Sequence, residues 1–75
     1  MRIAADAARK HGIPEDDILR AVRNEMYSAT TDDDDLVMVV GPAKTGNLLE
    51  IGIVDRDGDD PVVIHAMNLR PKFQR

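Results

Sequence analysis

The chain has 75 residues, of which fourteen are acidic and ten are lysine or arginine, so its formal charge is −4. This length makes one domain, residues 1–75, and the absence of cysteine excludes disulfide bonds and thiolate zinc sites. An acidic chain with no long apolar run and no signal-peptide core is not expected to coat nucleic acid or to enter a membrane. We expect a cytoplasmic domain, and because small cores gain stability from association, we expect a homo-oligomer or a hetero-complex.

Two helices are predicted in the N-terminal part. The range 3–11 is alanine-rich with apolar residues at helical spacing, and Gly12 is well placed to end it. Pro14 suits the first turn of a second helix, and the acids that follow it complement the positive helix end. This helix is predicted to end near Ser28. Its apolar residues repeat with a helical period and should form one buried stripe: Ile18, Leu19, Val22 and Met26.

Three strands are predicted after a polar loop over residues 29–35. They are an apolar run at 36–40, an alternating segment at 47–54 and a final strand at 62–67. The short connections favour antiparallel neighbours. The order therefore predicts an α+β fold in which two N-terminal helices pack on one face of a three-stranded antiparallel meander (ααβββ).

The first and third of these strands are apolar on both faces, although one face of such a sheet should be polar. Strict alternation puts Val63, His65 and Met67 together on the face that the helices leave open. Either this face is an interface, or Phe73 and the tail fold back across it. The interface is the favoured interpretation.

Two acidic segments, 32–35 and 55–60, lie in predicted connections. The glycine and glutamate positions of a calcium-binding EF-hand loop are not matched in the second segment, and no ligand close in sequence completes a site around the first. Solvated loops are the simpler interpretation of both. We expect no metal and no cofactor.

The segment 61–75 contains no acid and offers the best candidate site. Metal-independent RNA cleavage needs cations that hold the phosphate and a histidine or lysine that transfers protons during attack by the 2′-hydroxyl. His65, with Arg70 and Lys72 beyond it, fits that requirement. From composition alone, a histidine satisfied on a sheet face and a solvated basic tail are the simpler alternative.

A family resemblance adds to this pattern. Residues 9–18, RKHGIPEDDI, resemble the lysine-histidine-glycine helix opening of BrnT-type toxins, and the later segments VGP…GNLLE and VIHAM…RPKF resemble a compact actinobacterial group of toxin-like proteins. The resemblance implies a type II toxin of the RelE/BrnT superfamily, an mRNA-cleaving ribonuclease that a small cognate antitoxin neutralises. Lys10 and His11 match the basic helix position of the family, and Arg70 and Lys72 occupy the place where basic residues follow the last strand.

The expected function is that of a toxin acting as a metal-independent mRNA endoribonuclease. The candidate catalytic residues are His65, Arg70, Lys72 and His11, and the candidate RNA-binding residues are Lys10, Asn68 and Arg75. The expected partners are the cognate antitoxin and RNA. The alternative is a non-catalytic interaction module that pairs through its apolar sheet face.

Overall fold

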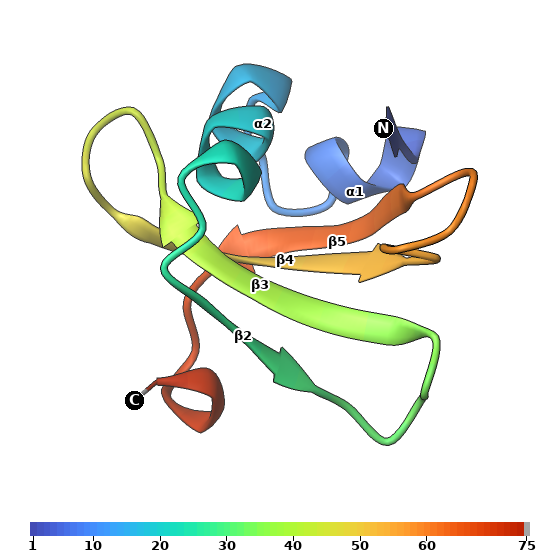
Figure 1. The fold of residues 1–75 in the computed structure, drawn as a ribbon. Coiled ribbons are helices and arrows are strands. Elements are labelled where there is room, and N and C mark those ends of the chain that lie inside the picture. Colours follow the sequence, from blue (N-terminus) through green and yellow to red (C-terminus); the bar gives the residue numbers. More distant parts are fainter. Residues whose placement is uncertain (75) are drawn as a thin grey trace.

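The computed structural model describes residues 1–74, and in this range five strands form one mixed sheet beneath two helices (Figure 1). The strand order across the sheet is β1-β5-β4-β3-β2, and every neighbouring pair is antiparallel except β1 and β5. No helix in this range is long and apolar enough to cross a membrane. The elements are β1 (Arg2–Ile3), α1 (Ala5–Arg9), α2 (Glu15–Arg23), β2 (Tyr27–Thr30), β3 (Leu36–Pro42), β4 (Leu48–Val54), β5 (Val62–Asn68) and the 3₁₀ turn η1 (Pro71–Phe73).

The prediction of a three-stranded antiparallel meander is wrong. The strands β3, β4 and β5 do form a meander with both helices on one face, but β1 and β2 extend the sheet at its two edges. The strand β2 exists because α2 ends at Arg23, well before Ser28. The side chain of Asn24 donates a hydrogen bond to the carbonyl of Arg20 (2.9 Å), and asparagine bonding of this kind competes with helix continuation.

The edge strand β1 was missed because two residues carry no periodic signal. It pairs in parallel with β5, and the amide of Ala4 donates to the carbonyl of Val63 (2.8 Å) immediately after it. This pairing brings the N-terminus beside the last strand, so α1 lies over β5. The sheet is therefore mixed, whereas short connections alone suggested antiparallel pairing throughout.

The apolar core lies between the helices and the sheet. The helix α2 buries Ile18 and Ala21, whereas Leu19 and Met26 of the predicted stripe are 38% and 60% exposed. The backbones of α2 and β3 approach closely at Gly41, where a Cβ atom would lie 2.0 Å from the carbonyl oxygen of Ala21. Only glycine permits this approach.

The opposite face of the sheet, called the open face below, is partly covered by the C-terminal tail. Figure 1 shows η1 beneath the sheet, on the side away from the helices. The hydroxyl of Tyr27 donates to the carbonyl of Phe73 (2.8 Å) and fixes the tail there. The tail thus folds back, as the less favoured interpretation held. Apolar residues that stay partly exposed on this face include Leu36, Val54, Val62 and Met67.

Candidate functional site

A fully buried carboxylate, Glu50, lies on the open face of the central strand β4. The backbone amide of Arg70 donates to its Oε1 (2.8 Å), and the guanidinium Nη2 of Arg70 donates to its Oε2 (2.6 Å). The Nε2 atom of His65 lies 2.9 Å from the same Oε2. Burial, the largest single influence, favours the neutral acid, but the hydrogen bonds from Arg70 and His65 together outweigh it. The pKa of Glu50 therefore lies below its ordinary value of 4.5, and the group is ionised at neutral pH.

The surrounding sequence explains why the tail reaches this carboxylate. The neighbours of Glu50 across the sheet are Val40, which is fully buried, and Met67, which is partly buried, so both flanks of the carboxylate are apolar. Arg70 is extended (φ −90°, ψ 152°), the conformation favoured before a proline, and Pro71 then starts the turn. Because the backbone amide and the side chain of Arg70 both donate to Glu50, the carboxylate holds the start of the tail on the sheet.

His65 reaches the open face through a β-bulge. Gly52 pairs with His65 but the next residue of β4, Ile53, pairs with Val63, so Ile64 is the extra residue of β5. Val63 therefore joins the core beneath the helices, and the prediction that it shares a face with His65 is wrong. Strict alternation fails because a bulge shifts every later side chain to the other face. A Cβ atom at Gly52 would lie 3.0 Å from the Cβ of His65, so glycine makes room for the imidazole.

His11 lies in the turn that follows α1, and the fold brings it to His65. Gly12 adopts φ +66° and the amide of Ile13 donates to the carbonyl of Ala8 (3.0 Å), a geometry that ends the helix and fixes this turn. The centroids of the two imidazole rings are 6.0 Å apart, and their planes are inclined by 76°. Both histidines line a cleft of about 280 Å³ between α1 and β5, together with Lys10.

The contact with Glu50 defines which nitrogen of His65 is free. An ionised carboxylate can only accept a hydrogen bond, so Nε2 of His65 carries the hydrogen that it donates to Glu50. In the neutral ring, Nδ1 then has a free lone pair that can accept a proton. This is the arrangement in which a carboxylate orients an imidazole base.

The other predicted site residues are not gathered in this cleft. Lys72 is exposed, and its Nζ lies 5.1 Å from the ring centroid of Phe73. Asn68 pairs with Leu49 at the far end of β5, and it lines a separate hollow with Leu48 and Gln74. Arg75 lies outside the described residues.

The residue that sequence reasoning missed is Glu50. Alternation along β4 assigned it to a face expected to be polar, where a glutamate needs no explanation. The available signal was its position in a strand flanked by two strands that are apolar on both faces, because a charge surrounded by such neighbours needs a buried partner. The acid-free tail offered that partner in Arg70.

The cleft therefore contains two imidazoles, the ammonium group of Lys10 and the carboxylate of Asp6, beside a buried ion pair. Among residues 1–74, no three histidine, aspartate or glutamate side chains converge as they would around a metal ion. In comparisons with protein-family models, with curated proteins and with solved structures, no match to the chain was found.

Proposed function

We propose that this protein is the toxin component of a type II toxin–antitoxin system and that it cleaves mRNA without a metal ion. One observation carries the proposal: His65, held by the buried carboxylate of Glu50, lies beside His11 in a cleft that also contains Lys10. Two proton-transfer groups from distant parts of the chain meet there, next to a cation. A base, an acid and a cation in this arrangement can accelerate cleavage of RNA by its own 2′-hydroxyl.

The two histidines have complementary roles in the proposed reaction. Nδ1 of His65 accepts the proton of the 2′-hydroxyl while the 2′-oxygen forms a bond to phosphorus. The bond from phosphorus to the 5′-oxygen breaks, and protonated His11 gives its proton to that oxygen. The products are a 2′,3′-cyclic phosphate and a free 5′-hydroxyl. Lys10 offsets the negative charge that develops on the phosphoryl oxygens.

Arg70 acquires a different role from the one that its sequence position suggested. Its Nε and Nη2 atoms both donate to Glu50, so the edge of the guanidinium that carries these atoms is occupied within the protein. We assign it as a positioning residue, which keeps Glu50 ionised and thereby keeps His65 oriented. Lys72 is exposed beside the tail and contributes long-range attraction for RNA.

The proposed partner is a small antitoxin, and the proposed place of action is the cytoplasm, where mRNA is available. An antitoxin that inhibits cleavage has to cover or distort the cleft between α1 and β5. Ile64, which is 45% exposed, lines this cleft and gives such a partner an apolar contact.

The test is cleavage of a synthetic RNA by the purified protein in buffer with excess chelator. We expect His65→Ala and His11→Ala each to lower the cleavage rate by about 10²- to 10⁴-fold, the usual contribution of a general acid or base. Thr30→Ala, an exposed change at the edge strand β2, is the matched control and should cleave as the wild type does. A substrate with 2′-deoxyribose at the cleavage position should resist cleavage. If folded wild-type protein leaves the RNA intact, or if both histidine variants cleave normally, the proposal is wrong.

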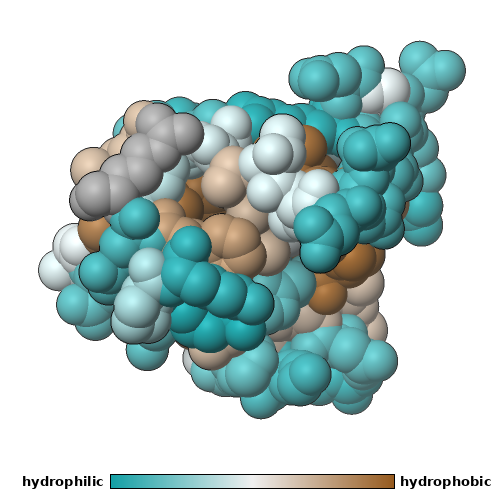
Figure 2. Space-filling view, turned by 90° about the horizontal axis from the view of Figure 1, so that it is seen from below, coloured by the Kyte–Doolittle hydropathy of each residue, from teal (hydrophilic) through white to brown (hydrophobic). Residues whose placement is uncertain are grey.

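A second candidate function is a non-catalytic interaction module. The observation that favours it is the apolar surface that the tail leaves partly exposed on the open face, where Figure 2 shows brown surface among hydrophilic regions. Expression of the protein alone in a bacterium separates the two candidates. Growth arrest that His65→Ala abolishes supports the ribonuclease, whereas normal growth with abundant folded protein supports the interaction module.

A further inference from the structure

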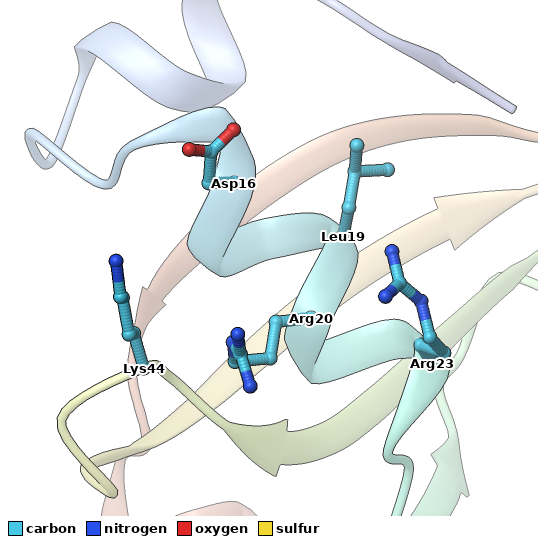
Figure 3. Close-up of a pocket in the computed structure, with 5 residues that line it drawn as sticks. All are labelled: Asp16, Leu19, Arg20, Arg23 and Lys44. Carbon is cyan, nitrogen blue, oxygen red and sulfur yellow. The ribbon is translucent and has the colours of Figure 1, made fainter.

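A second group of cations lies on the outer side of α2, away from the histidine cleft. Arg20 and Arg23 project from the helix at a spacing that puts them on one side of it, and Lys44 comes from the loop between β3 and β4. Figure 3 shows Arg20 between Lys44 and Arg23. With Asp16 and Leu19 these residues line a hollow of about 220 Å³, called the basic groove below.

The cations of the basic groove form no ion pair within the described residues. The ion-paired arginines of residues 1–74 are Arg2, Arg9, Arg56 and Arg70. Asp16 lines the same groove but makes no ion pair with its cations. Although the chain has more acidic than basic residues, these three cations lie together without a carboxylate partner. Their donors are therefore available to an external anion.

The loop that carries Lys44 is held against the helix. The backbone amide of Lys44 donates to Oδ1 of Asp17 (2.9 Å), in the first turn of α2. This bond fixes the position from which the lysine side chain extends. A binding site that is already assembled spends less free energy on ordering its groups when a ligand arrives.

The two acidic loops lie at one end of the sheet, and the loop with Lys44 and the basic tail lie at the other. Leu36 pairs with Val54, so the two acidic loops that adjoin these residues meet at one end, where the amide of Asp55 donates to the carbonyl of Asp35 (3.3 Å). The loop with Lys44 lies at the other end of the same two strands, and the basic tail leaves β5 at that end too. The net charge of −4 is therefore unevenly distributed, and a polyanion is repelled less at the end with the basic tail than at the end with the acidic loops.

We propose that the basic groove binds a backbone phosphate of an RNA strand. The inference rests on the proposed function, since the strand it binds is the one cleaved between His11 and His65. The hollow is smaller than the roughly 300–1,000 Å³ of sites that enclose a whole small molecule, so it suits a phosphate and not a base. Contacts of this kind fix the position of a strand without reading its sequence.

The test uses a ligand that the protein cannot cleave, a fluorescein-labelled single-stranded DNA, which has phosphates but no 2′-hydroxyl. Binding is followed by fluorescence anisotropy over a series of salt concentrations. Each phosphate contact to a single strand contributes about 0.7 to the slope of log K against log salt. We expect the triple variant Arg20→Gln, Arg23→Gln and Lys44→Gln to bind more weakly and to lower that slope by about 0.7, the contribution of the one phosphate that the groove binds. Arg2→Gln removes another exposed arginine, at the end with the acidic loops, and it is the control for Arg20→Gln because it changes the net charge by the same amount.

Each outcome decides the inference. Weaker binding by Arg20→Gln than by Arg2→Gln, with the reduced slope in the triple variant, supports it. Wild-type binding and slope in the triple variant overturn it, as does the absence of binding by the wild type. The result does not depend on catalysis: a protein that binds the DNA through the groove but cleaves no RNA refutes the proposed ribonuclease and retains the phosphate site. If the wild type cleaves RNA but the triple variant binds the DNA as the wild type does, the ribonuclease proposal is retained and the phosphate site is refuted.

Discussion

Two adjacent residues of β4, Glu50 and Ile51, are both fully buried but on opposite faces of the sheet. Ile51 belongs to the apolar core beneath the helices. Glu50 is buried beneath the tail and has Arg70 and His65 as partners. The two sites are equally inaccessible to water, yet different forces stabilise them.

The difference separates the part of the molecule that holds the fold from the part that carries the candidate chemistry. Burial of Ile51 is favourable at any protonation state, because no ionisable group contributes to it. Burial of Glu50 is favourable only while its charge is compensated, because an unpaired buried charge is strongly unfavourable. A change of pH should therefore alter the contribution of the open face to the free energy of unfolding but not the contribution of the helix-covered core.

The largest expected effect is on the helix-covered face. Ile51→Ala removes buried methyl groups and leaves a cavity, so it should lower the free energy of unfolding by about 2–5 kcal/mol. Urea denaturation at neutral pH measures this change. A chain this small has a total stability of roughly 4–11 kcal/mol, so Ile51→Val, with an expected loss of about 0.5–1.5 kcal/mol, is the variant to use if the alanine variant does not fold. Neither variant should alter the dependence of stability on pH. If either variant changed the loss of stability at acidic pH, the two faces would not contribute independently.

A smaller effect is expected at Glu50. Glu50→Gln keeps the volume but removes the charge from the hydrogen bonds with Arg70 and His65. Bonds to a charged group contribute about 1.5–3 kcal/mol, so a loss in the lower part of that range is expected because the amide keeps weaker bonds. The same urea measurement at neutral pH gives the value. A variant as stable as the wild type would show that the buried charge contributes nothing to the fold.

The sign of the pH dependence distinguishes this loss from a packing defect. The pKa of Glu50 is lower in the folded protein than in the unfolded chain. Its contribution is therefore complete above the unfolded value, near 4.5, and is lost as the pH falls through the lower folded value. The stability curves of the wild type and Glu50→Gln should approach each other in that acid range. The pKa of Asp60 is also lowered, by its hydrogen bond from Arg2, but this pair is present in both proteins and cancels in the comparison. Parallel curves down to low pH would contradict the assignment.

The helix-covered face was the part of the fold that periodicity could predict. The apolar runs located β3, β4 and β5, and Gly12 marked the end of α1, because these signals are local. The open face could not be predicted in the same way. The bulge at Ile64 depends on the pairing of two strands, and the burial of Glu50 depends on a tail twenty residues away. His11 and His65 were chosen as separate candidates, but only the fold shows that they share one cleft.

The smallest expected effect is that of Tyr27→Phe, and its coupling to changes at Glu50 and Ile51 tests whether the two faces are independent. Tyr27→Phe removes the hydrogen bond to the carbonyl of Phe73, and it should lower the free energy of unfolding by about 0.5–1.5 kcal/mol. Tyr27 and Glu50 hold the same tail, so the double variant with Glu50→Gln should differ from the sum of the single effects. The double variant with Ile51→Val should be additive within about 0.5 kcal/mol, because that residue does not contact the tail. Urea denaturation of the wild type, the three single variants and the two double variants measures both cycles. Equal coupling in the two cycles would mean that the tail and the helix-covered core respond as one unit, and additivity in both would mean that the tail is held at two independent points.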